Sequence, residues 1–244
     1  MSLNPMHQFE VYKVGPEISI GGINLSFTNS SFFMTISAIL ILTLLFFGTK
    51  KKSLIPSKIQ LITEISYTFI GKMINDTAGS SAKAYFPFVF TLFMFVLFCN
   101  MVGMFPYSFT VTSQIIVTFM LASVIFIGVT IIGFIKHGIK YLELFVPKGV
   151  PLVLLPIIVI IEIISYLSRP VSLAVRLFAN MLAGHTMLKV FGGFVLSLGL
   201  LGGWLPLSFS VALTGLEVLV AFLQAYVFAI LTCIYLNDAL NLHQ

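Results

Sequence analysis

Charged residues are scarce in this 244-residue chain: they make up only 9% of it, whereas 59% of the residues are hydrophobic. A soluble domain carries roughly 25% charged residues because its surface has to face water. The low charge therefore excludes a soluble globular protein and places the chain in the membrane class. The net charge of +5 does not indicate nucleic-acid binding, because the basic residues are divided among separate segments.

Motifs for disulfides, metals and nucleotides are also missing. The two cysteines, Cys99 and Cys233, lie in different apolar stretches and have no CxxC or Cys/His spacing, so the sequence indicates neither a disulfide framework nor a zinc site. Neither GxxxxGKS nor GxxxxGKT occurs, and we expect the chain not to bind or make ATP by itself. We expect no cofactor and no metal. No internal repeat is visible, which argues against an inverted-repeat transporter, and no cleaved signal peptide is expected.

Apolar stretches are abundant, and five of them are long enough to cross a bilayer, which takes about 20 residues. We therefore predict an all-α membrane protein with a single membrane domain over 1–244. After a mixed polar segment over 1–29, the predicted crossing helices cover 32–47, 85–105, 115–135, 151–198 and 206–236.

A sixth helix is predicted between the first two crossings. Ser57 and Gln60 have the spacing of a capping box, which marks a helix start. Ile59, Ile62 and Met73 then fall on one side at helical spacing, together with Ser66 or Phe69. This pattern indicates an interfacial amphipathic helix over 57–76 that lies along the membrane surface.

The distribution of lysine predicts the orientation. Nine of the thirteen Lys and Arg residues lie in two segments, Lys50–Lys83 and Lys136–Lys148. Loops rich in Lys and Arg stay on the cytoplasmic or matrix side of a membrane. The N-terminus should consequently lie outside and the C-terminus inside.

The fourth crossing stretch, 151–198, is far longer than a bilayer requires. Such a helix is either strongly tilted or broken. Pro170 could kink it, but the glycines at 192–193 and 199–203 are better candidates for its end.

Arg176 lies inside this stretch, where the other residues indicate burial in lipid. Arginine at the centre of a membrane helix costs about 2.5–3.5 kcal/mol on insertion scales, so an acidic partner or a water-filled path has to offset that cost. Glu162, Arg169 and Arg176 follow one another at intervals of seven, which places them in one stripe on one helix face. His185 is about half a turn away from Arg176 and should face a different direction.

The last stretch repeats the spacing of seven with Ser210, Glu217 and Gln224. Two polar stripes in lipid should face each other or a shared aqueous cavity. A carboxylate and a histidine there can pass protons by changing their protonation state, whereas a guanidinium stays protonated and serves as a fixed charge.

Structural roles are the alternative for the same residues. Glu162 and Arg169 could form a salt bridge that lets the helix insert into the membrane. His185 could be a satisfied core histidine, and Gln224 could form a hydrogen bond between helices.

The run Arg-Leu-Phe-Ala-Asn-Met-Leu-Ala-Gly-His over 176–185, preceded by Ser-Arg-Pro-Val-Ser-Leu over 168–173, resembles the signature of the a subunit of F-type ATP synthase. The likeness covers nearly the whole chain. Its other matching segments are 5–10, 56–60, 98–106 and 224–228.

The resemblance implies that the two long tilted helices form a hairpin against a rotating ring of c subunits, with one aqueous half-channel open to each side. Arg176 matches the essential arginine, which faces the ring carboxylate. His185 and Glu217 match the pair that lines the outer half-channel. Many bacterial relatives carry Glu and His in exchanged order, whereas mitochondrial and alphaproteobacterial members resemble the arrangement here.

Three further positions match the family. Asn180 and Gln224 match polar residues near the arginine, and Glu162 matches an acid of the inner half-channel. The protein would then be a stator subunit, non-catalytic on its own, that couples proton translocation to rotation and ATP synthesis. Its implied partners are the c-ring, peripheral-stalk subunits of the b type, other Fo and F1 subunits, and the lipid bilayer, with no nucleic acid.

The expected location is the mitochondrial inner membrane, with a bacterial plasma membrane as the alternative. A stand-alone ion channel or secondary transporter is the competing function, and a non-conducting membrane scaffold is a third. A scaffold would have little use for Arg176, His185 and Glu217 within the bilayer.

Overall fold

The computed structural model describes residues 8–14, 19–20, 23–24, 26–50, 55–105, 108–146 and 154–241. Six long helices build the molecule: α1 (Asn29–Lys50), α2 (Lys58–Ala78), α3 (Phe86–Gly103), α4 (Ile115–His137), α5 (Leu155–Gly202) and α6 (Trp204–Leu240). The paired strands β1 (Ser19–Ile20) and β2 (Ile23–Asn24) precede α1, and the 3-10 turns η2 (Ser80–Tyr85), η3 (Val111–Ser113) and η4 (Gly138–Phe145) lie between later helices.

Five helical segments of the described chain are long and apolar enough to cross a membrane. They are Asn29–Lys50, Ser80–Gly103, Ile115–Leu142, Leu155–Gly199 and Trp204–Leu240. This confirms the predicted all-α membrane fold with five crossings and one further helix, which is α2.

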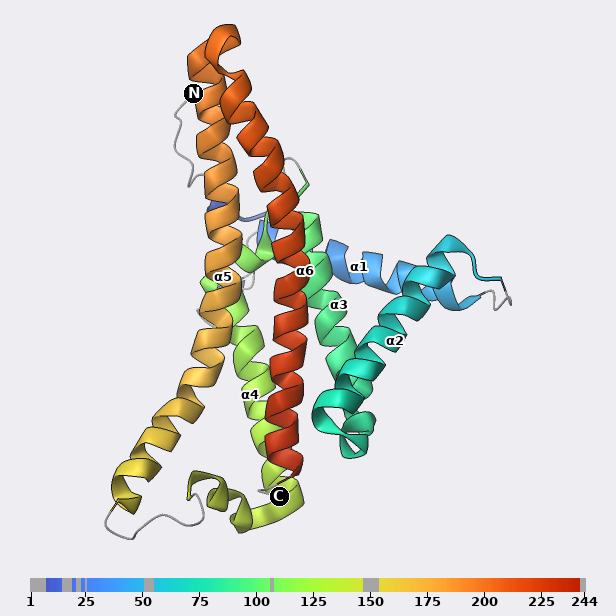
Figure 1. Cartoon of the computed structure of the whole chain (residues 1–244), viewed down its shortest axis with the longest axis vertical. Helices are drawn as coiled ribbons and strands as arrows, with labels where there is room; N and C mark the ends of the chain where they lie inside the picture. The colour runs from blue at the N-terminus through green and yellow to red at the C-terminus, as the bar shows by residue number, and fades with distance from the viewer. Residues whose placement is uncertain are drawn as a thin grey trace.

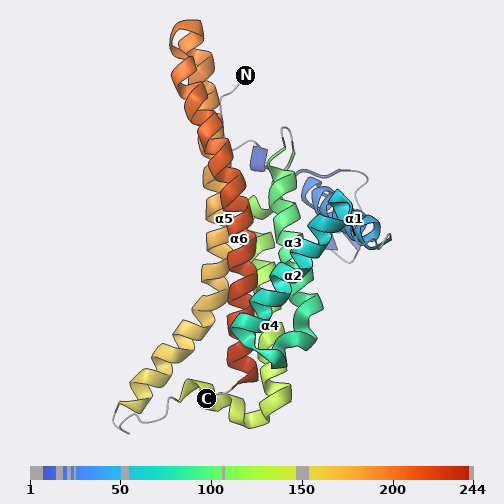
Figure 2. The same ribbon diagram turned by 45° about the vertical axis from the view of Figure 1, so that its right-hand side comes forward.

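The long helices α5 and α6 form an antiparallel hairpin whose tip extends beyond the rest of the molecule (Figure 1). α3 and α4 lie beside the lower part of this hairpin in both views, and α1 with α2 forms a second pair that projects to the side (Figures 1 and 2). We call the two ends of the α3–α4 pair the Gln114 end and the Lys136 end.

The tip of the hairpin is made by glycine. Gly199 has φ of 61° and ψ of −157°, a backbone conformation that breaks the helix and that glycine adopts readily. A Cβ on Gly203 would lie 2.6 Å from the carbonyl oxygen of Gly199, so this position requires glycine as well. Of the predicted breaks, the chain therefore uses 199–203, while helix α5 runs on through Pro170 and through 192–193.

The length of α5 bears on its tilt. The 45 residues from Leu155 to the break at Gly199 correspond to about 68 Å at about 1.5 Å per residue, more than twice the ~30 Å of bilayer hydrocarbon. α1 has 22 residues and about matches that thickness. α1 also runs across the direction of the hairpin (Figure 1), so a membrane that α1 crosses would hold α5 and α6 strongly inclined.

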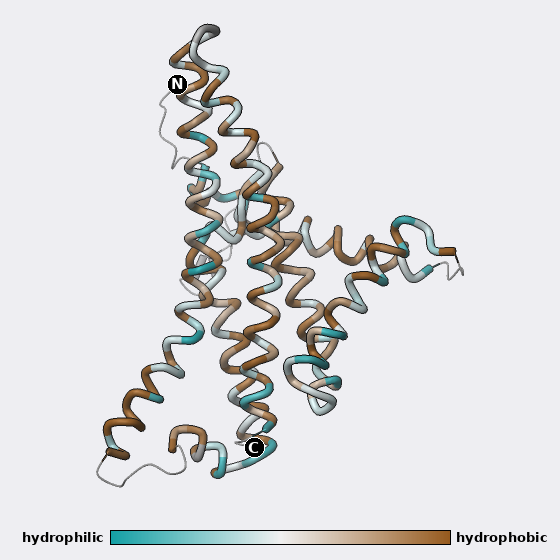
Figure 3. Tube along the Cα trace, in the orientation of Figure 1, coloured by the Kyte–Doolittle hydropathy of each residue, from teal (hydrophilic) through white to brown (hydrophobic). Residues whose placement is uncertain are grey.

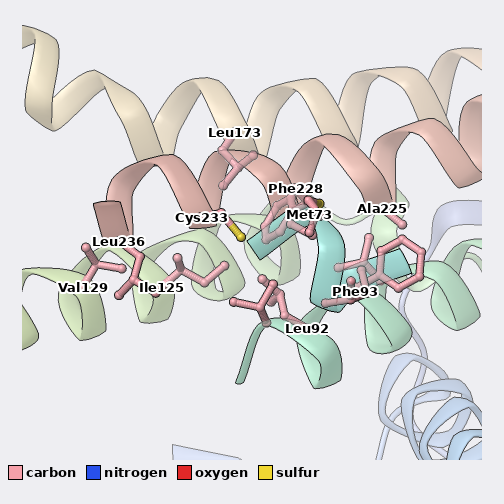
Figure 4. Close-up of a cluster of buried hydrophobic side chains, with 14 of the residues drawn as sticks. Met73, Leu92, Phe93, Ile125, Val129, Leu173, Ala225, Phe228, Cys233 and Leu236 are labelled. Atoms are coloured by element: carbon pink, nitrogen blue, oxygen red, sulfur yellow. The ribbon is translucent and has the colours of Figure 1, made fainter. Parts of the chain in front are cut away.

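The core lies where α2, α3, α4 and α5 meet α6 (Figure 4). The side of α6 that faces it carries a row of fully buried alanines, Ala221, Ala225 and Ala229. Small side chains at intervals of four let helix backbones approach closely, which is how helices associate without a hydrophobic driving force in lipid. Phe93 and Phe228 fill the space beside this row.

The helix α2 divides its apolar residues differently from the prediction. Ser57 caps it as expected, because its hydroxyl accepts the backbone N–H of Gln60 at 3.3 Å. Met73, however, is buried in the core, whereas Ile59 and Ile62 are 45% and 53% exposed. The residues predicted to share one face are therefore divided between the core and the exposed surface of α2, which packs against α1, α3 and α6.

Candidate functional site

His185 of α5 and Glu217 of α6 meet inside the hairpin. The imidazole Nδ1 lies 3.1 Å from the Glu217 Oε1, and the two side chains are only 12% and 5% exposed. Helix packing allows this because position 184 is glycine: a Cβ there would lie 2.8 Å from the same oxygen. The contact is not aligned as a hydrogen bond, and both Glu217 oxygens are buried with no hydrogen-bond partner in the described chain.

The other imidazole nitrogen contacts the connection between α3 and α4. Thr110 Oγ1 lies 2.8 Å from His185 Nε2 and donates its own hydrogen to the carbonyl oxygen of Gly103, at 3.2 Å. Because the hydroxyl has one hydrogen, Nε2 has to be the donor toward Thr110. Nδ1 then faces the carboxyl group, and the geometry leaves room for one transferable proton between His185 and Glu217.

Arg169 forms a second contact between α5 and α6. Its Nη1 donates to Asp238 Oδ2 at 2.9 Å, with side-chain exposures of 22% and 33%. The guanidinium also lies 5.4 Å from the Tyr166 ring and 5.1 Å from the Tyr235 ring. The alternative in which Arg169 forms a salt bridge with Glu162 is not what the described chain shows, because Arg169 pairs with Asp238.

Arg176 differs from Arg169, one heptad earlier. Its side chain is exposed, and no acidic group of the described residues lies within the 4.0 Å of an ion pair. Its exposed neighbours one turn away on the same helix face, Ser172, Ala179 and Asn180, are small or polar, and the apolar side chain beside it is Val175. Figure 3 shows the hydrophilic positions of α5 as short interruptions in a mainly hydrophobic helix. The positive charge of Arg176 thus has no acidic partner among the described residues.

The other predicted site residues lie apart. Asn180 is exposed on α5, one turn beyond Arg176. Gln224 on α6 and Glu162 on α5 are half-buried, and neither has a hydrogen bond or ion pair within the described residues. No direct polar contact between described residues joins the two heptad stripes, since Glu217 turns to His185 instead.

Sequence reasoning missed several polar residues around the His185–Glu217 pair. Asn100 of α3 is fully buried and donates from Nδ2 to the carbonyl oxygen of Ala221 at 3.1 Å, while its Oδ1 has no partner in the described chain. Thr112 is also buried, and its hydroxyl has no described partner. An asparagine inside the apolar stretch 85–105 was the available signal, because buried polar groups in lipid require a reason.

A metal site is not built into the described residues, which contain no group of three His, Cys, Asp or Glu side chains close enough to hold an ion.

Comparison with known proteins gives a consistent result. The family model described as ATP synthase A chain matches residues 31–237. The chain is 76% identical to ATP synthase subunit a of Pelagibacter ubique (strain HTCC1062), with all of both chains covered. It is 59% identical to ATP synthase subunit a of Rhizobium rhizogenes, over 99% of this chain and 98% of the relative. It is 56% identical to ATP synthase subunit a of Mesorhizobium japonicum, over 98% and 97%.

Proposed function

The chain belongs to the family of ATP synthase A chains, and from this premise we propose that it is the stator subunit that provides two proton half-channels and the arginine between them. In this role it couples proton flow to rotation of a c-subunit ring, and the ATP chemistry takes place in other subunits.

The unpaired charge of Arg176 carries this proposal. An arginine exposed on a helix that is long and apolar enough to cross a membrane is costly in lipid unless a counter-charge meets it. Because no acidic group of the described chain meets it, the counter-charge belongs to another subunit. A carboxylate on each c subunit would pair with Arg176 in turn as the ring rotates. A fixed guanidinium would also prevent protons from passing directly between the half-channels.

The His185–Glu217 pair supplies the outer half-channel in this account. A buried carboxyl group without hydrogen-bond partners can take up a proton, and the neighbouring imidazole can deliver one. Asn100 and Thr112 add unpartnered oxygens close to the same helices, where water molecules could be held. Glu162, which lies toward the opposite end of α5, is assigned to the inner half-channel.

Asn180 and Gln224 complete the proposed path near the arginine. Neither side chain has a hydrogen bond with a described residue, so both are available to a partner subunit or to water.

The energetics agree with such a separation. A proton that crosses the potential gains about 2.3 kcal/mol per 100 mV, and a leak past Arg176 would waste that work. We place the N-terminus and the Gln114 end outside and the Lys136 end inside, because the lysine-rich segments face the cytoplasm.

The membrane is proposed to be a bacterial plasma membrane. The relatives described above are all bacterial, and nothing in the comparisons supports the expected mitochondrial inner membrane. No observation favours a stand-alone channel or transporter. The c-ring and the b-type stalk subunits are the partners that this role requires.

The test is ATP-driven proton pumping by the complete ATP synthase in reconstituted vesicles. Arg176→Ala should abolish pumping, and Arg176→Lys should also fail if the planar, weakly hydrated charge is required. Val175→Ala, which trims an exposed neighbour on the same turn, is the matched control and should pump almost normally. Near-normal pumping by a fully assembled Arg176→Ala enzyme would contradict the proposed function.

A further inference from the structure

The segment Gln8–Val14, which we call the N-terminal strap, is tied across the Gln114 end of the molecule. Four hydrogen bonds hold it: Val14 N to Phe27 O at 2.7 Å, Asn29 N to Tyr12 O at 3.1 Å, Asn29 Nδ2 to Glu10 O at 3.1 Å, and Gln114 Nε2 to Phe9 O at 2.8 Å. The strap is therefore fixed both to the start of α1 and to the start of α4.

Phe9 brings the strap to His185. Its half-buried ring lies with its centroid 6.5 Å from the centroid of the imidazole, at an interplanar angle of 54°. Glu217 and Thr110 contact the two imidazole nitrogens, and Phe9 contacts the ring itself. His185 is thus held by α6, by the α3–α4 connection and by a segment more than 170 residues earlier in the chain.

A side chain at the start of α4, Gln114, holds Phe9 in place. Gln114 donates from Nε2 to the backbone oxygen of Phe9 and so fixes the backbone that carries the aromatic ring. Next to Phe9, the amide nitrogen of Gln8 is buried and has no partner among the described residues.

We propose that Phe9 is a positioning residue for the proton-transfer pair: it keeps the His185 imidazole between Thr110 and Glu217 and limits the water that reaches it. The proposal rests on the proposed function of the pair. The tilted Phe9 ring occupies space beside the imidazole, and without it the imidazole can rotate away from its two polar partners. Aromatic contacts of this kind change an equilibrium by a few-fold to about tenfold.

The charged groups around His185 define what the proposal predicts for pH dependence. Glu217 faces it from α6, and Lys189 follows one turn later on α5. The connection over 108–114 carries no charged residue, and Glu10 is the nearest acid of the strap. Removal of the Phe9 ring changes the hydration of the imidazole but none of these charges, so a changed pH profile would report the loss of positioning.

The experiment measures ATP-driven pumping by the complete enzyme in vesicles across a pH series. Phe9→Ala should lower the maximal rate by about three- to tenfold and should shift the pH profile, whereas Phe9→Tyr, which keeps the ring, should restore both. Gln114→Leu should shift the profile in the same direction because it removes only the anchor. Tyr12→Ala is the matched control, since this side chain lies in the same strap and is 63% exposed.

The role of Phe9 and the proposed function of the His185–Glu217 pair can fail independently. An unshifted profile in Phe9→Ala, with a His185→Ala enzyme that is impaired, would overturn the role of Phe9 and leave the proposed function intact. An unimpaired His185→Ala enzyme would overturn the proposed function of the pair. If Phe9→Ala fails to assemble, as judged by the amount of this subunit in purified enzyme, Gln114→Leu decides: an unshifted profile there overturns the proposal.

Discussion

Two contacts between a basic and an acidic side chain join α5 to α6, and they differ in whether the acidic group is hydrogen-bonded. At the Lys136 end, Arg169 and Asp238 form a hydrogen-bonded pair at 2.9 Å, and two tyrosine rings flank the guanidinium. Nearer the Gln114 end, His185 and Glu217 approach to 3.1 Å, but the carboxylate oxygens have no hydrogen bond with a described residue. A saturated pair holds helices together, whereas an unsaturated buried pair can bind and release a proton.

Arg176 lies between the two pairs along α5 and is a third case. Its charge is neither saturated nor buried. Along α5 the hairpin therefore carries, in succession, a hydrogen-bonded ion pair, a charge with no acidic partner among the described residues, and the buried His185–Glu217 pair for which we propose proton transfer. The spacing of seven puts Arg169 and Arg176 on the same helix face, so the sequence pattern alone does not separate their roles. Their contacts do, because Arg169 pairs with Asp238 and Arg176 pairs with no acidic group of the described residues.

The largest effect within this comparison is expected at the reactive pair. Glu217→Gln and His185→Ala should each reduce ATP-driven pumping by at least about tenfold, because general acid–base groups contribute roughly 10²–10⁴-fold to rate. Both changes should also alter its pH dependence. The exchange of His185→Glu with Glu217→His keeps one acid and one imidazole and should recover part of the rate. Pumping with the original rate and pH profile in both single variants would reduce the pair to packing residues.

A smaller effect is expected from Gly184→Ala. The added Cβ would lie 2.8 Å from Glu217 Oε1, and overpacking of this kind costs typically 1–3 kcal/mol. Pumping should fall without a change at any titratable residue. Gly215→Ala on α6 is the control, because a Cβ there meets nothing within 4 Å. Equal activity of the two variants would show that the close approach of α5 and α6 at position 184 does not matter.

The smallest effect is expected at the saturated pair. Arg169→Ala or Asp238→Ala should lower pumping by less than about fivefold, because partly exposed ion pairs contribute about 0–1 kcal/mol. The charge exchange Arg169→Asp with Asp238→Arg should restore part of the loss and leave the pH profile unchanged. Complete loss of pumping in Arg169→Ala with normal assembly would instead place Arg169 in the proton path.

The sequence was sufficient for the fold because length and hydropathy alone determine which stretches can cross a bilayer. It also placed His185 and Arg176 in different directions, since helical geometry fixes the angle between them. It could not identify Asp238 as the partner of Arg169, or Thr110 as the partner of His185, because periodicity defines a face of a helix and not what packs on it. Asn100 is a different case, because an asparagine inside an apolar stretch is a signal that the sequence itself contains and that was overlooked.

The central claim is that the counter-charge of Arg176 belongs to another subunit. Cysteine crosslinking in the assembled membrane enzyme tests it directly: Asn180→Cys, exposed one turn from Arg176, is paired with cysteines placed next to the carboxylate of the c subunit, and Leu42→Cys, 66% exposed on α1, is the control. The native Cys99 and Cys233 are buried and should not react. We predict crosslinks from position 180 to c-subunit positions beside the carboxylate and none from position 42. The absence of any crosslink from position 180 in a fully assembled, active enzyme would contradict the account.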